Sequence, residues 1–228
     1  MKYFLSTILL AFTLFTSVPA QADRVVMTFC DSRCNTTSSG STNWPTMLDN
    51  QRADFIVCNK GLNGRRPSGG LVDIATAITQ CQAMGTLTDA VILLGVNALL
   101  DGVSSDLATN QIRDIAAQVE AAGVVPWIVA ETPGPIAWGG FSYMNAYQYT
   151  QDNVNLLRYK NAVGVLYPII EVRDALLKNL KVGTALVPGY WFRKAVGDTG
   201  SCSNDDLHPT NPTCRQQIFA DTVSEAIP

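Results

Sequence analysis

The chain has 228 residues, of which 47% are hydrophobic and 15% charged, which provides enough apolar material for a buried core and excludes a disordered chain. Its 16 Lys and Arg residues against 19 Asp and Glu residues give a formal net charge of -3. Because nucleic-acid binding needs clustered positive charge, this balance argues against a nucleic-acid partner.

The first segment has the pattern of a secretory signal peptide. Lys2 precedes an apolar run over residues 4–15, and a small-x-small pattern follows the run. The run is too short for a membrane-spanning helix, which needs about 20 residues. We therefore expect residues 1–22 to be removed on export. The remaining residues 23–228 would then form one domain, secreted or periplasmic, without a stable membrane anchor.

Five short apolar runs follow along the rest of the chain. They are rich in β-branched residues and stop at turns of Gly, Asn or Asp, which is typical of buried strands. These runs cover residues 24–29, 54–58, 90–94, 124–130 and 162–167. Strands that are apolar throughout indicate a parallel sheet with both faces covered.

Two segments between these runs carry apolar residues at helical spacing. The residues concerned are Leu71, Ile74, Ala75, Ile78 and Cys81 in the first segment, and Leu107, Ile112, Ile115, Ala116 and Val119 in the second. Asp106 suits the start of the second helix, and Gly123 suits its end. The alternation of strands and amphipathic helices predicts a single α/β domain.

Six cysteines lie beyond the signal segment: Cys30, Cys34, Cys58, Cys81, Cys202 and Cys214. An even number in an exported chain predicts three disulfides. Cys202 and Cys214 bracket one short polar loop and are expected to pair. The other four either pair locally, Cys30 with Cys34 and Cys58 with Cys81, or across neighbouring strand ends, Cys30 with Cys58 and Cys34 with Cys81. We favour the local pairing. With one His in the chain, a Cys/His metal site is not expected.

The turns after the strands are the informative part of the sequence, because ligands of open parallel sheets bind at the carboxyl ends of the strands. Polar and glycine residues of interest in these turns and near the carboxyl end are Ser32, Asn59, Gly61, Gly64, Asn97, Asp205 and His208. A Ser, oxyanion donors and an Asp-x-x-His pair are the parts that acyl transfer requires. Taken singly, Ser32 could be a helix cap and His208 an ordinary loop residue. Together they favour catalysis.

This constellation resembles the SGNH hydrolases, also called GDSL esterases and lipases. The first family block, Gly-Asp-Ser-Leu, corresponds to residues 30–33, and the second, Asn-x-Gly-x-x-Gly, to residues 59–64. The third, Gly-x-Asn-Asp, corresponds to residues 95–98, and the last, Asp-x-x-His-Pro, is intact at residues 205–209. The resemblance implies a three-layer α/β/α, flavodoxin-like fold with a five-stranded parallel sheet.

The resemblance also implies a role for each matching residue. Ser32 would be the nucleophile, His208 the base, and Asp205, rather than Asp206, the carboxylate that orients the imidazole. The backbone amides of Ser32 and Gly64 and the side-chain amide of Asn97 would donate to the oxyanion.

Three positions depart from the family pattern. Cys30 replaces Gly, Arg33 replaces Leu, and Ala98 replaces the Asp of the third block. None of these changes removes a group that does chemistry. We expect Cys30 to restrain the nucleophile turn through a disulfide, and Arg33 to bring a positive charge near the entrance.

These observations predict a secreted serine esterase that hydrolyses carboxylic esters with short to medium acyl chains, with no metal or organic cofactor. One alternative is an O-acetyl esterase that acts on polysaccharide, and another is a non-catalytic carbohydrate-binding protein. The expected partner is a small ester or an acylated carbohydrate, and the chain is taken as a monomer. Aromatic residues that are candidates for lining an acyl or sugar pocket are Trp138, Phe141, Tyr143, Tyr147, Tyr149, Trp191 and Phe192.

Overall fold

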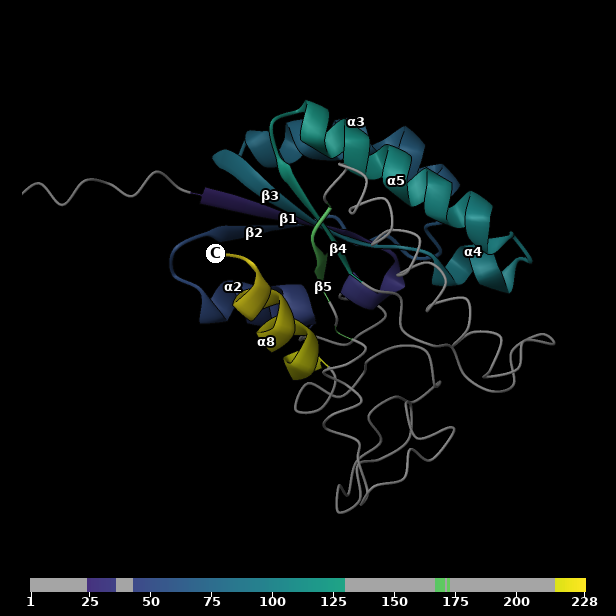
Figure 1. Cartoon of the computed structure of the whole chain (residues 1–228). Helices are drawn as coiled ribbons and strands as arrows, with labels where there is room; N and C mark the ends of the chain where they lie inside the picture. The colour runs from purple at the N-terminus through teal and green to yellow at the C-terminus, as the bar shows by residue number, and fades with distance from the viewer. Residues whose placement is uncertain (1–23, 36–42, 130–166, 171, 173–215) are drawn as a thin grey trace, which may run out of the picture.

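The computed structural model describes residues 24–35, 43–129, 167–170, 172 and 216–228, and it contains a parallel sheet with helices on both faces (Figure 1). The sheet has five strands in the order β2-β1-β3-β4-β5, and every neighbouring pair is parallel. This is the strand order of flavodoxin-like sheets, in which β2 lies on one side of β1 and the strands from β3 onward follow on the other side. The predicted three-layer α/β fold is confirmed.

Four of the five strands lie where the apolar runs predict them. The strands are β1 (Arg24–Cys30), β2 (Ile56–Asn59), β3 (Thr86–Leu93), β4 (Val125–Val129) and β5 (Ile169–Ile170). The fifth was predicted over residues 162–167, of which 162–166 lie outside the described residues and Tyr167 is not in a strand. The sheet is instead completed two residues later, after Pro168, whose carbonyl accepts from the N–H of Ile128 at 2.9 Å.

The helices form one layer on each face of the sheet (Figure 1). Their bounds are α2 (Trp44–Gln51), α3 (Pro67–Gln82), α4 (Val96–Leu100), α5 (Ser105–Ala121) and α8 (Gln217–Ala226), and a 3-10 turn, η1 (Ser32–Cys34), follows β1. Helices α3 and α5 pack together on one face, and α2 and α8 pack together on the other. Both helices predicted from periodicity, α3 and α5, are confirmed.

The ends of α5 are set by residues on either side of it. The Ser104 hydroxyl accepts from the N–H of Leu107 and caps the helix, so Asp106 lies inside the first turn, where its charge suits the helix dipole. Gly123 follows the last turn with a φ of 76°, a left-handed conformation in which glycine is favoured. The predicted end of the helix is therefore confirmed.

Each face of the sheet has its own hydrophobic core. Side chains of β1 alternate between them, with Met27 and Phe29 toward α3 and α5, and Val26 toward α2 and α8. Fully buried residues of the first core include Ile74, Ile92 and Ile115, and those of the second include Trp44, Leu48 and Leu93. Burial on both faces explains why the strands read as unbroken apolar runs.

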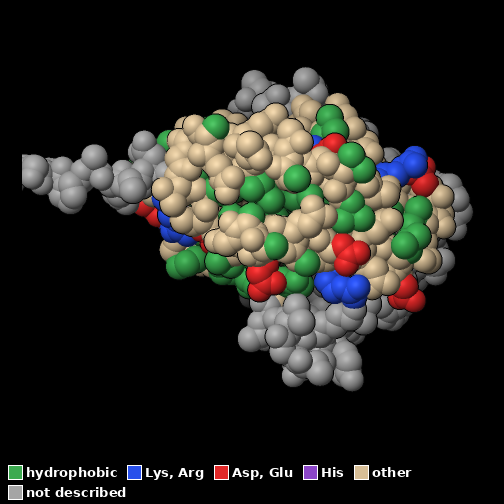
Figure 2. All heavy atoms as spheres, turned by 90° about the horizontal axis from the view of Figure 1, so that it is seen from above, with side chains coloured by type: hydrophobic (Ala, Val, Ile, Leu, Met, Phe, Trp, Pro, Cys, Tyr) green, Lys and Arg blue, Asp and Glu red, His purple; other side chains and the backbone are tan. Residues whose placement is uncertain are grey.

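The outer surface of the α3–α5 layer carries exposed hydrophobic side chains as well as polar ones. Figure 2 looks onto this layer, where hydrophobic side chains show between polar ones. Asp73 is the one charged residue within α3, and Val72 of the same helix is 79% exposed. Within the described ranges, no helix is long and apolar enough to cross a membrane.

Candidate active site

Ser32 lies directly beyond the carboxyl end of β1, in the 3-10 turn η1. The turn is capped by Asp31, whose side chain accepts from the N–H of Arg33 at 3.0 Å. Asp31 in turn donates its N–H to the carbonyl of Leu93 in β3, at 3.3 Å. Ser32 is therefore not the cap of this turn, and it stands beside the point where the sheet reverses its order, as expected for a ligand site.

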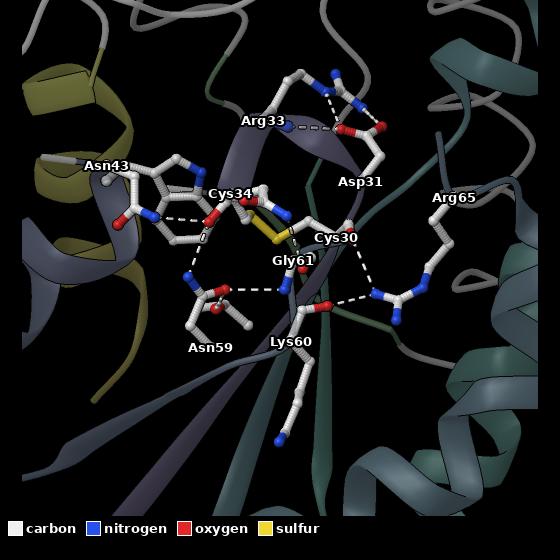
Figure 3. The surroundings of a disulfide bond; sticks show 12 residues. Cys30, Asp31, Arg33, Cys34, Asn43, Asn59, Lys60, Gly61 and Arg65 are labelled. Atoms are coloured by element: carbon white, nitrogen blue, oxygen red, sulfur yellow. Dashed lines mark hydrogen bonds and ion pairs between the residues drawn. A yellow bond between two sulfur atoms is a disulfide. The ribbon is translucent and has the colours of Figure 1, made fainter. Parts of the chain in front are cut away.

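A disulfide and an ion pair enclose the turn around Ser32. Cys30 is bonded to Cys34, and both residues are completely buried. Between them, the guanidinium of Arg33 donates through Nε to Asp31 Oδ1 at 2.9 Å and through Nη2 to Oδ2 at 2.6 Å (Figure 3). Ser32 thus occupies the centre of a five-residue segment that is cross-linked twice.

Two expectations from the sequence meet different outcomes here. Cys30 does restrain the turn of Ser32, through the local pairing, and the second local pair, Cys58 with Cys81, joins β2 to α3. The expectation that Arg33 brings a positive charge to the entrance is wrong, because its side chain is 2% exposed and its charge is balanced by the buried Asp31. A bidentate pair with a carboxylate two residues away compensates for removing the guanidinium from water.

The loop after β2 is bound to this turn by side-chain amides. Asn59 donates through Nδ2 to the carbonyl of Cys34 at 2.8 Å, and its Oδ1 accepts from the N–H of Gly61 at 2.9 Å (Figure 3). Asn43, at the start of α2, donates to the same carbonyl at 2.7 Å. A Cβ at Gly61 would lie 2.7 Å from the backbone C of Cys34, so only glycine fits where loop and turn meet.

Gly64 lies in a tight turn of the same loop. The N–H of Arg65 donates to the carbonyl of Leu62 at 3.1 Å, which closes the turn, and Gly64 has a φ of 69°. A positive φ at the third turn position requires glycine or a similarly permissive residue. The N–H of Leu62 donates to the carbonyl of Cys30 at 3.1 Å, so this turn is attached to the strand end that carries Ser32.

Asn97 reaches the same region from the short helix α4 that follows β3. Its Nδ2 donates to the carbonyl of Arg65 at 3.2 Å. Ala98, where the family pattern has Asp, is 1% exposed and packs with Ala108 and Val103. Its N–H donates to the carbonyl of Gly95 at 2.9 Å. The small side chain at this position packs α4 against α5.

One continuous hydrogen-bonded network therefore links the segments that carry the three described site residues. It runs from the turn of Ser32 through the carbonyl of Cys30 to the loop of Gly64, and from the carbonyl of Arg65 to Asn97. Asp205, Asp206 and His208 lie outside the described residues, and so do Cys202 and Cys214, as well as the seven candidate aromatic residues. In the described part of the chain, no group of three or more His, Cys, Asp or Glu side chains could hold a metal ion.

Arg65 is the residue of this region that sequence reasoning missed. It is 9% exposed, although an arginine in a polar loop ordinarily faces solvent. The only signal in the sequence was that Arg65 directly follows Gly64, the last residue of the second family block.

No protein-family model and no curated protein matches this chain. Solved structures do match it over most of its length. A psychrotrophic esterase, EstA, from Pseudoalteromonas sp. superimposes with a TM-score of 0.63 at 15% identity, covering 90% of this chain and 96% of its own. A member of the lipolytic protein G-D-S-L family from Veillonella parvula DSM 2008 gives 0.63 at 15% identity, with 90% and 98% covered. A GDSL-like lipase from Bacteroides thetaiotaomicron VPI-5482 gives 0.60 at 16% identity, with 90% and 87% covered.

At these identities the likeness establishes the fold, and the activities named for those proteins are theirs. The chain has the fold of the SGNH hydrolases.

Proposed function

We propose that the protein is an exported serine hydrolase of carboxylic esters, with Ser32 as its nucleophile. The observation that supports this most directly is the network that joins the turn of Ser32, the turn of Gly64 and the side chain of Asn97 at the carboxyl ends of β1, β2 and β3. A tetrahedral oxyanion needs several fixed donors around the nucleophile, and rigid loops at neighbouring strand ends can supply them.

The donors of the proposal are the backbone amides of Ser32 and Gly64 and the side-chain amide of Asn97. One N–H of the Asn97 amide donates to the carbonyl of Arg65, which fixes the plane of the amide. An amide carries two N–H donors, and the second is the one assigned to the oxyanion. The left-handed turn at Gly64 and the clamped turn at Ser32 supply the other two.

The proposed base is His208, and Asp205 would hold its imidazole in the required tautomer. Both assignments rest on the sequence motif Asp-x-x-His-Pro at residues 205–209. Ser32 Oγ attacks the ester carbonyl carbon while its proton passes to the imidazole. Collapse of the tetrahedral intermediate breaks the bond to the alcohol oxygen, which takes that proton. Water then attacks the acyl carbon while the same imidazole takes a proton from it. The bond to Ser32 Oγ breaks, Oγ takes that proton, and the carboxylic acid is released.

The proposed setting is outside the cytoplasm, with residues 1–22 removed and residues 23–228 forming one hydrolase domain. Two disulfides among the described residues suit an oxidising compartment. The proposed substrates are small esters with short to medium acyl chains.

The test is hydrolysis of nitrophenyl esters from acetate to a long chain by the oxidised protein, by Ser32→Ala and by Ser224→Ala. Ser224 lies in α8, in the helix layer with α2, and serves as the matched control. We expect Ser32→Ala to lose at least about 10³-fold in kcat/KM, because no other group would form the acyl-enzyme. Ser224→Ala should keep the rate of the unaltered protein. Equal rates for all three proteins would refute Ser32 as the nucleophile.

A second measurement identifies the nucleophile chemically. A nitrophenyl phosphonate ester transfers its phosphonyl group to an activated Ser and releases nitrophenolate, and the Pseudoalteromonas esterase was solved in a form inhibited by monoethylphosphonate. Mass spectrometry should find the adduct on the peptide of Ser32. Turnover of acetylated xylan without turnover of the nitrophenyl series would instead indicate a polysaccharide O-acetyl esterase. Absence of both turnover and labelling would indicate a binding protein.

A further inference from the structure

The side chain of Arg65 is anchored at four places in the interior of the site region. Its Nη1 donates to the carbonyl of Cys30 at 2.9 Å and also to the carbonyl of Lys60 (Figure 3). Its Nε pairs with Asp73 of α3 at 3.3 Å, and its guanidinium lies over the ring of Phe29, 4.2 Å from the centroid. These contacts join β1, the loop after β2 and the helix α3.

The backbone of Arg65 contributes to two of the three proposed oxyanion donors. Its N–H closes the turn that presents Gly64, by donating to the carbonyl of Leu62 at 3.1 Å. Its carbonyl accepts from Asn97 Nδ2 at 3.2 Å. A displacement of the Arg65 backbone would therefore move the Gly64 amide and reorient the Asn97 amide together.

We propose that Arg65 is a positioning residue, whose buried guanidinium fixes its own backbone so that the amides of Gly64 and Asn97 converge on the oxyanion. This inference rests on the proposed ester hydrolysis and deepens it. The guanidinium suits the task because it forms a rigid planar fork of donors, which a flexible ammonium cannot reproduce.

The buried guanidinium of Arg65 has partners that compensate for its loss of contact with water. Burial lowers the pKa of Arg65, while the nearby carboxylates of Asp73 and Asp31 act in the opposite direction. A guanidinium that gives up water needs carbonyl and carboxylate partners in return, and the structure supplies both. Its neighbour Arg66 is 52% exposed and pairs with Asp101 at the surface. The two adjacent arginines thus differ in burial and in partners.

The effect should appear in kcat rather than in KM. An oxyanion develops only in the transition state, so donors that are misplaced weaken the transition state and leave ground-state binding almost unchanged. A misplacement of about 1 Å costs roughly 100-fold in rate. Arg65→Met keeps most of the aliphatic stem over Phe29 and removes all donors, so we expect kcat to fall by roughly 100-fold at an almost constant KM.

The experiment compares Arg65→Met, Arg65→Lys and Arg66→Met on one nitrophenyl ester, each checked for folding by circular dichroism. Arg65→Lys keeps the charge without the fork and should recover part of the lost kcat. Arg66→Met should match the unaltered protein. If Arg65→Met does not fold, Arg65→Lys decides alone: a lowered kcat at constant KM supports the proposal, and an unchanged kcat overturns it.

A double-mutant cycle with Asn97→Ala separates positioning from a general structural role. If Arg65 acts partly through Asn97, its replacement should cost several-fold less in kcat once Asn97 is gone. Losses that simply multiply would overturn the proposed route. Absence of turnover in the unaltered protein would refute ester hydrolysis and this inference with it. Normal turnover with an unchanged kcat in Arg65→Met would refute this inference alone.

Discussion

The close approach at Gly61 allows a sharp test of how the loop after β2 is held against the turn of Ser32. A Cβ added there would lie 2.7 Å from the backbone C of Cys34, 2.8 Å from its Cβ and 2.9 Å from the backbone N of Asn35. Real Cβ atoms essentially never approach other atoms so closely, and two of the three are backbone atoms that cannot rotate away. Gly61→Ala therefore forces the loop and the turn apart.

The size of the effect follows from this crowding. Overpacking of a buried contact typically costs about 1–3 kcal/mol, and we expect Gly61→Ala to lower the free energy of unfolding by that amount. The displaced segments carry Ser32 on one side and lead to Gly64 on the other. Because a shift of about 1 Å can reduce a rate by roughly 100-fold, kcat should fall by up to that factor.

Urea unfolding followed by circular dichroism measures the stability, and nitrophenyl ester hydrolysis measures kcat. Gly69→Ala in α3 is the matched control, because a Cβ at that exposed position would meet no atom within 4 Å. Ala favours a helix over Gly by up to about 1 kcal/mol, so Gly69→Ala should be neutral or stabilising. If Gly61→Ala were as stable as Gly69→Ala and kept the original kcat, the close-packing argument would be refuted.

Two further predictions concern the cross-links and the surface charges. Loop-closure entropy for a separation of 4 residues predicts that Cys30→Ala/Cys34→Ala loses about 2 kcal/mol in urea unfolding, whereas removing the β2–α3 disulfide, with a separation of 23, loses about 3.4 kcal/mol. The first variant should nevertheless lose more kcat, because its loop contains Ser32, the proposed nucleophile, and the reverse order of kcat losses would contradict this. The hydrogen bond from Arg52 lowers the pKa of Asp54, so this carboxylate stabilises the fold above its ordinary pKa and the contribution is lost as the pH falls through the lowered value. Asp54→Asn should thus cost less than about 1 kcal/mol at pH 7, since the exposed pair is screened, and an unfolding difference that persists in acid would refute the assignment.

The sheet and the α3–α5 helix layer were predictable because they depend on local apolar patterns, whereas α2 and α8 were not predicted as helices. Residues 24–29 and 90–94 read as buried strands since both faces of the sheet are covered, which removes the polar alternation of a half-exposed strand. The fifth strand was predicted over residues 162–167, whereas β5 among the described residues follows Pro168, in a mainly apolar stretch that runs from Ala162 to Ile170. Periodicity cannot say which part of such a stretch pairs with β4, and the described pairing uses Ile169 and Ile170.

The candidate site was predictable only in part. The positions of Ser32, Gly64 and Asn97 after consecutive strands follow from the order of motifs, and a parallel sheet brings those turns to one edge. The burial of Arg33 and Arg65 did not follow, because it depends on partners. Arg65 finds its acceptors at Cys30 and at Asp73, far apart in sequence and joined only by the fold. An arginine without those acceptors would remain in water.

Three of the bonds that hold these loops share one chemical feature. The carbonyl of Cys34 accepts from the side-chain amides of Asn43 and Asn59, and the carbonyl of Cys30 accepts from the guanidinium of Arg65. Each of these three bonds pairs a side-chain donor with a backbone acceptor, although backbone N–H groups of Arg33, Gly61, Leu62 and Arg65 also donate within the same loops. The proposed oxyanion donors include the backbone N–H groups of Ser32 and Gly64. A bond that occupied either of these two N–H groups would remove a donor from the proposed reaction, whereas a bond to a carbonyl does not compete for it. Polar donors such as Arg65 are therefore the physically suitable supports for this site, and substitutions by apolar residues of similar size should stabilise the loops less well even where they fill the space.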